Sequence, residues 1–89
     1  MEGTPAKIAD RFVDTEIDDE VVLMRLSDGH MFSLTGTSRE IWQCIDGART
    51  VAAVADQLAE RHGAPRDTVH EDVATFIAEL RDAGLVEIA

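Results

Sequence analysis

Residues that could carry catalytic or metal chemistry are few in this chain of 89 residues, and they are scattered. The histidines His30, His62 and His70 fall in different parts of the sequence, and neither an H-E-x-x-H nor a C-x-x-C spacing occurs. The single cysteine, Cys44, has no histidine near it, which favours a buried and inert thiol. No phosphate-binding glycine loop or nucleophile elbow is present. We therefore predict a protein that is not an enzyme and needs no metal and no cofactor.

The charge of the chain bears on its partners. Eighteen acidic and eight basic residues give a formal net charge of −10. Nucleic-acid binding gains most of its affinity from lysine and arginine that neutralise phosphates, so nucleic acid and anionic membranes are disfavoured. One cysteine cannot form an internal disulfide, and no apolar run approaches the length of a membrane span. We expect a cytoplasmic protein.

The elements that would position a binding site change character near Gly36. Residues 1–10 show no periodicity and are predicted to be a flexible lead-in, followed by a single domain over 11–89. Residues 12–15 form a weak strand candidate, and the acidic stretch 16–20 is predicted to be a solvated turn. The front of the chain is therefore strand-like, with at most three strands.

The clearest local signal is a hairpin. Residues 21–26 and 30–34 flank Asp28-Gly29, a dipeptide typical of two-residue type I′ turns. Such a turn would place Leu23 opposite Leu34. Alternation assigns Val21, Leu23, Phe32 and Leu34 to one face, and Val22, Met24, Leu26, Met31 and Ser33 to the other.

Both faces of this hairpin are apolar. A hairpin that packs one face on the core and exposes the other to solvent needs only one apolar face. We predict that Val22, Met24, Leu26 and Met31 dock a partner, or a second copy in a homodimer, because methionine adapts to irregular surfaces. The alternative is that residues 1–17 fold back over this face. At least one sheet edge should also stay open.

The back of the chain has helical periodicity. Thr37 and Glu40 form a capping-box pattern that predicts a helix over 38–46, and Thr50 is placed to cap a second helix. A third helix is predicted over 67–83. The predicted fold class is α+β and winged helix-turn-helix-like, with a three-stranded N-terminal antiparallel sheet followed by three helices.

Four motifs occur in the order found in the PqqD family, which this chain resembles between residues 30 and 86. They are H-M-F-S-L-T-G-T-S, then I-W, then D-G-A-R-T-V, and finally D-V-A-T-F-I-A-E-L closed by G-L-V. The chain departs from the family pattern at Thr35, where asparagine is usual, and at Ile77, where leucine is common. Both changes keep the character of the position.

The resemblance implies a stand-alone RiPP recognition element. Such domains bind the leader segment of a ribosomally made precursor peptide and present it to a modifying enzyme, either a protease and cyclase or a radical-SAM enzyme. Family members serve lasso-peptide, PQQ and other peptide-maturation pathways, and residues 20–34 look slightly more like the lasso-pathway members. The leader typically adds as a strand beside the third strand and packs against the third helix.

That mode implies a peptide-binding set of Met31, Phe32, Ser33 and Leu34 from the strand, with Asp72, Phe76 and Glu79 from the helix. Asp72 and Glu79 share one shoulder of the helix and would favour a leader that carries lysine or arginine; solvated acids without a partner are the alternative. Two rival functions stay open: a winged-helix DNA-binding regulator, and a small subunit that docks on an enzyme through the Met-rich face. The five acids and two arginines of residues 66–82 disfavour the regulator.

Overall fold

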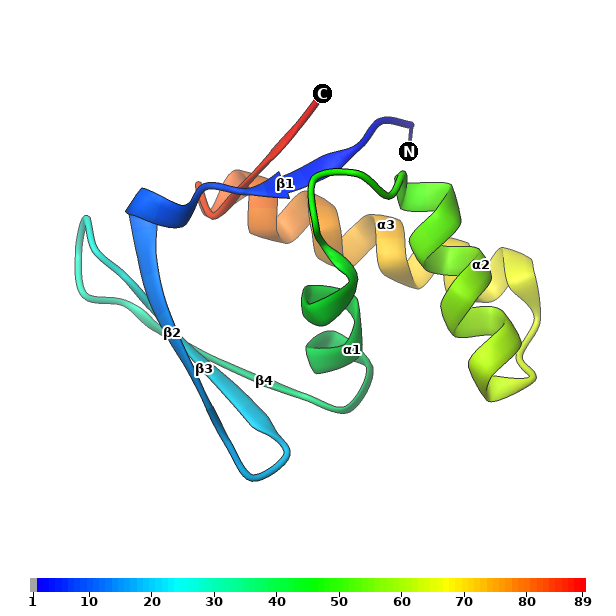
Figure 1. The fold of residues 1–89 in the computed structure, drawn as a ribbon, viewed down its shortest axis with the longest axis horizontal. Helices are drawn as coiled ribbons and strands as arrows, with labels where there is room; N and C mark the ends of the chain where they lie inside the picture. The colour runs from blue at the N-terminus through cyan, green and yellow to red at the C-terminus, as the bar shows by residue number, and fades with distance from the viewer. Residues whose placement is uncertain (1) are drawn as a thin grey trace.

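A three-stranded antiparallel sheet occupies the first half of the chain (Figure 1). The computed structural model describes residues 2–89, and in it β2 (Phe12–Ile17), β3 (Glu20–Arg25) and β4 (Met31–Thr35) pair in the order β2-β3-β4. The central strand is therefore β3, and both β2 and β4 are edges. The sheet contains the three expected strands, but the turn predicted over 16–20 is confined to Asp18 and Asp19, because β2 continues through Ile17 and β3 begins at Glu20.

The prediction of one sheet is wrong, because the two ends of the chain form a second sheet. Strand β1 (Pro5–Lys7) pairs antiparallel with β5 (Val86–Ile88), as the adjacent ends of the ribbon in Figure 1 show. Pro5 is buried at this junction. A three-residue strand that begins with proline has no alternation to detect. Its pairing depends on where the fold brings the two ends together.

The register of the β3–β4 hairpin also differs from the prediction. Leu23 pairs with Phe32, not with Leu34, because the loop spans the four residues 26–29 instead of two. The loop is closed by a hydrogen bond of 2.8 Å from the Gly29 amide to the Arg25 carbonyl oxygen, and Gly29 has a φ of 71°. A shift of two residues leaves every side chain on its predicted face.

Three helices follow the sheet: α1 (Gly36–Cys44), α2 (Val51–His62) and α3 (Arg66–Asp82). The Thr50 hydroxyl caps α2 as predicted, and it accepts a hydrogen bond of 3.0 Å from the Ala53 amide.

The predicted capping box at the start of α1 does not form. Helix α1 begins one residue before Thr37, and Thr35 occupies the cap position. The Glu40 carboxylate reaches across to α2, where it contacts His62 at 2.6 Å. Tertiary contact has replaced the local interaction that the pattern indicated.

The core lies between the helices and the inner face of the three-stranded sheet. Trp42 of α1 is buried against Phe12 with an edge-on ring contact of 5.2 Å, and its indole nitrogen donates to Asp14 at 3.3 Å. Leu23, Val73 and Ile77 are fully buried in the same cluster. Complete burial of each such side chain contributes about 1.5–3 kcal/mol to folding.

Candidate functional site

Strand β4 carries unpaired backbone groups along its outer edge. The Arg25 amide donates to the His30 carbonyl oxygen at 2.8 Å, which makes this a hydrogen-bonded pair of the antiparallel ladder. Hydrogen-bonded and non-bonded pairs alternate along such a ladder. The N–H and C=O groups of Met31 and Ser33, and the N–H of Thr35, therefore point away from β3, where no other strand among residues 2–89 pairs with them.

This edge has none of the usual protection against strand pairing. The segment Met31–Thr35 contains no charged residue and no proline. Natural proteins commonly guard open edges with charges, prolines or bulges. An extended peptide meets no electrostatic or steric obstacle along β4.

Residues next to the two ends of β4 approach the two ends of α3. At one end the Arg25 guanidinium donates to the Ala83 carbonyl oxygen at 3.0 Å. At the other end Thr37 lines a cavity of about 220 Å³ together with Val69 and Asp72.

Half-buried apolar side chains lie on β4 and along α3. Phe32 from β4, with Val69 and Phe76 from α3, packs against the core cluster while keeping part of its surface exposed. Leu34 lies deeper and is 5% exposed. The wall is therefore apolar at its base and open above, an arrangement that lets a peptide strand bury alternate side chains.

Helix α3 turns one of its two shoulders toward Thr37, two residues beyond the end of β4. Asp72 is exposed and lines the same cavity as Thr37, and Glu79 lies two turns further along the same side of α3. On the opposite shoulder His70 lines a different hollow, next to Gly3 and Thr50. The strand members of the predicted peptide-binding set lie on β4 and the helix members on α3, so their joint contact with one peptide stays a prediction.

A cluster at the turn end of β4 was not identified from the sequence. Asp28 accepts two hydrogen bonds from Arg25, at 3.0 and 2.7 Å, and one of 3.0 Å from the His30 amide. The Arg25 hydrogen bond and the His30 amide hold the pKa of Asp28 well below its usual range. The only signal in the sequence was a charged residue on an otherwise apolar strand face.

The outer face of the sheet forms a second, apolar surface. Val13, Val22, Met24 and Met31 line a hollow of about 310 Å³, and Met31 is 57% exposed. We call this surface the Met-rich face. Residues 2–17 do not cover it, because β1 pairs with β5 and β2 lies beside β3 in the same sheet. Leu26, predicted to join this face, follows β3 and lines a separate hollow with Arg11 and Gly84.

Side chains that could bind a metal ion do not cluster in the part of the chain that the structure describes. No group of three or more histidine, cysteine, aspartate or glutamate residues there could hold a metal ion. Cys44 is a buried free thiol. Within residues 2–89, no helix is both long enough and apolar enough to cross a membrane.

An uncharged open edge beside a half-buried apolar helix stripe defines a small domain able to accept an extended chain. Residues 20–86 match the family model described as coenzyme PQQ synthesis protein D (PqqD). The chain therefore belongs to the PqqD family, and the resemblance inferred from its motifs is confirmed.

Two curated relatives are both named PqqA binding protein. The one from Rhodopseudomonas palustris (strain BisB5) is 43% identical over 47 residues, which are 53% of this chain and 46% of the relative. The one from Gluconobacter oxydans (strain 621H) is 31% identical over 55 residues, 62% of this chain and 57% of the relative. The matched segment thus spans only about half the length of these relatives.

A solved structure is similar over a larger part of the chain. It is described as TbiB1 in complex with the TbiA(beta) leader peptide, and it superposes with a TM-score of 0.81 at 32% sequence identity. The match covers 91% of this chain and 94% of that one. This match covers a larger share of the chain than the segments shared with the curated relatives.

Proposed function

We propose that this protein is a non-catalytic module that binds the leader segment of a ribosomally made precursor peptide and presents it to a modifying enzyme. The observation that carries the proposal is the uncharged, unpaired edge of β4, in a fold where β4 and α3 both keep half-buried apolar side chains. The names of the relatives support it, since they refer to PqqA binding and to a bound leader peptide. The site lies in the cytoplasm in this proposal, where precursor peptides are made.

The leader adds as a fourth strand to the three-stranded sheet. Its backbone pairs with the outward N–H and C=O groups of Met31 and Ser33 and with the N–H of Thr35, which gives affinity with little dependence on sequence. Its side chains alternate between the two faces of the extended sheet. One set enters the groove over Phe32 and Phe76, and selects the leader by size and apolar character.

The exposed acids of α3 add a preference for charge. Asp72 and Glu79 lie on the shoulder that turns toward β4, and the chain as a whole carries −10. A lysine or arginine in the leader is therefore favoured at this side of the groove, and an acidic residue is repelled. If both acids are merely solvated, their removal changes nothing.

The Met-rich face serves the presentation step. A leader strand on β4 would extend this face, because every second leader residue points to the same side as Met31. The occupant we propose is an apolar patch of the modifying enzyme with a basic rim, since the Asp18-Asp19 turn lies at the end of this sheet and is acidic. We propose a lasso-peptide pathway for this enzyme. Homodimer formation through the same face is the competing outcome.

Recognition of DNA by α3 is disfavoured by its charge. The helix carries Arg66 and Arg81 against five acids, a net −3 on the element that would enter a groove. Phosphates repel such a surface. DNA therefore serves as the negative control for the binding experiment.

Fluorescence anisotropy with labelled peptides tests the proposal. The probes are the TbiA(beta) leader, PqqA, and precursor peptides from short reading frames beside the gene, with a labelled duplex DNA as control. We expect binding of one peptide through its N-terminal half at about 1 μM or tighter, comparable to other strand-addition complexes, and no binding of DNA. Salt-sensitive binding of DNA without binding of any peptide would overturn the proposal.

A further inference from the structure

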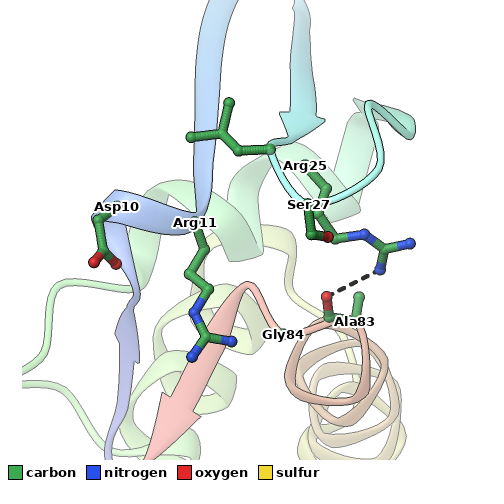
Figure 2. Close-up of a pocket in the computed structure, with 7 residues that line it drawn as sticks. Asp10, Arg11, Arg25, Ser27, Ala83 and Gly84 are labelled. Atoms are coloured by element: carbon green, nitrogen blue, oxygen red, sulfur yellow. Dashed lines mark hydrogen bonds between the residues drawn. The ribbon is translucent and has the colours of Figure 1, made fainter.

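Arg25, at the end of β3, contacts three separate parts of the molecule. Its Nε and Nη2 atoms donate to the two carboxylate oxygens of Asp28 at 3.0 and 2.7 Å, and its Nη1 donates to the Ala83 carbonyl oxygen at 3.0 Å. Figure 2 shows this side chain crossing from the sheet to the end of α3. Its guanidinium carbon also lies 5.5 Å from the centre of the Phe32 ring.

The hydrogen bond from Arg25 to the Ala83 carbonyl oxygen connects the three-stranded sheet to the end of α3, two elements that otherwise share few polar contacts. Helix α1 is fastened to β2 by several side-chain hydrogen bonds, including those of Trp42 to Asp14 and Gln43 to Glu16. Between the three-stranded sheet and α3, in contrast, the Arg25–Ala83 bond is the one side-chain hydrogen bond among residues 2–89. The two walls of the peptide groove are thus joined by polar contact only at its turn end.

The Ala83 carbonyl oxygen lies at a helix end that binds a cationic side chain favourably. Ala83 caps the C-terminal end of α3, where helix carbonyl oxygens lack intrahelical partners and the helix dipole is negative. A guanidinium group satisfies such an oxygen while keeping two further donors for a carboxylate. Lysine has one ammonium at the end of a flexible stem and cannot bridge both groups in this fixed geometry.

Asp28 holds Arg25 ready for this contact. The carboxylate binds the guanidinium through two parallel hydrogen bonds and also accepts from the His30 amide, so the loop and the side chain fix each other. The His30 ring lies 4.6 Å from the Phe32 ring on the same face. Phe32 forms part of the groove wall, so its orientation depends on this cluster.

We propose that Arg25 is a positioning residue that sets the separation of β4 from the C-terminal end of α3 and so shapes the groove for the incoming peptide. This inference rests on the proposed leader-binding function. A peptide gains affinity when the groove already has the bound geometry, because less ordering remains to be done on binding. Loss of the Arg25 bridge therefore weakens binding without removing any group that touches the peptide backbone.

The first experiment measures the groove itself, without a peptide. Spin labels at Met31→Cys and Glu79→Cys report the distance between β4 and α3 by pulsed electron paramagnetic resonance; Cys44 is buried and stays unlabelled. We expect a narrow distribution for the parent and a broader or longer one for Arg25→Gln. The matched control is Arg49→Gln, which breaks another arginine–aspartate pair three residues apart and should leave the distance unchanged.

The second experiment measures binding of the peptide that the parent protein binds best. Arg25→Gln should raise the dissociation constant about 10-fold, or about 1.4 kcal/mol. Arg25→Lys, which can reach one partner but not both, should fall between parent and Arg25→Gln. The control Arg49→Gln should stay within about twofold, the usual range of a remote surface change. Thermal melts verify that each variant is folded.

Shortened peptides separate positioning from general destabilisation. Removing peptide residues next to the turn end of β4 should abolish the difference between parent and Arg25→Gln, whereas shortening at the other end should preserve it. An unchanged label distance, or unchanged affinity in a folded Arg25→Gln variant, would overturn the inference. If the parent binds no peptide, the proposed function fails, and the label distance alone decides whether Arg25 sets the groove.

Discussion

The three-stranded sheet has two open edges, and they differ in nearly every respect that matters for strand pairing. On β2 the backbone groups of residues 12, 14 and 16 point outward, and two of these residues are the acids Asp14 and Glu16. On β4 the outward groups belong to Met31, Ser33 and Thr35, none of which is charged. One edge is guarded and the other is not.

The side chains explain how this asymmetry arises. Asp14 and Glu16 hold α1 through Trp42, Arg39 and Gln43, so the β2 edge is closed by charge and committed to the core of the fold. The β4 edge faces α3 across a groove and is fastened to it only near Ala83. The edges of sheets are normally protected against pairing with other chains. An unprotected edge therefore indicates that the protein uses it to pair with another chain. Experiments that change the β2 and β4 edges separately test this difference.

Proline substitutions at matched positions should have the largest effect. Ser33→Pro removes an outward N–H from β4 without breaking the ladder to β3, and should weaken leader binding by at least about 10-fold, because a peptide acceptor is left unpaired. Glu16→Pro removes the equivalent donor from β2 and should change leader binding by less than about twofold. Equal losses of leader affinity in the two folded variants, measured by anisotropy, would show that the two edges do not differ in leader binding.

Substitution of the Met-rich face should separate presentation from binding. Met24 lies on the central strand β3, between Val13 and Met31, and supplies no backbone group to the open edge of β4, so Met24→Gln should leave leader affinity unchanged. Its affinity for the modifying enzyme, measured by calorimetry with the leader bound, should fall about fivefold to tenfold, because apolar area is lost from the interface. Sedimentation of the free protein identifies the competing homodimer. A lower leader affinity would show that the face belongs to the peptide site.

Charge reversal on α3 should have a smaller and salt-dependent effect. Asp72→Lys with Glu79→Lys should weaken a basic leader about threefold to fivefold at low salt, since exposed charges interact weakly and are screened. The control, Glu71→Lys with Asp82→Lys, makes the same change in net charge on the solvent-facing back of the helix, about a quarter turn from Asp72 and Glu79. Titrations at two salt concentrations distinguish them. Identical behaviour of the two pairs would mean that the acids are only solvated.

The smallest effect concerns pH. The folded pKa of Asp28 lies below its ordinary value of 3.8 because Arg25 and the His30 amide hydrogen-bond to the carboxylate. The stabilisation is therefore complete above about pH 4 and is lost as the pH falls further, when protonation favours the unfolded chain. Melting curves between pH 6 and pH 2 should show a shallower decline for Asp28→Asn than for the parent. Parallel curves for the two proteins would show that Asp28 does not contribute to the pH dependence of stability.

Sequence patterns predicted the parts of the fold that depend on local periodicity. Alternation placed Val21, Leu23 and Leu34 on the buried face of the sheet, and Thr50 was correctly assigned as a helix cap. The β1–β5 sheet was missed because its strands are three residues long and meet only through the tertiary fold.

The candidate site shows the same limit. Its strand and helix residues follow from the family motifs, but the shoulder of α3 that turns toward β4 required the fold. The hairpin register failed because the sequence does not reveal that Arg25 and Asp28 pair to close a four-residue loop. The Arg25–Ala83 contact spans 58 positions, and no local pattern encodes it.

Amide hydrogen exchange measured by NMR, with and without the best-binding leader peptide, tests the central claim most directly. The free protein should exchange rapidly at the outward amides of Met31, Ser33 and Thr35. Bound peptide should slow exchange there, because these N–H groups become donors to the added strand. The outward amides of Phe12, Asp14 and Glu16 on β2 should not change. Protection confined to β2, or binding with no new protection on β4, would contradict the account.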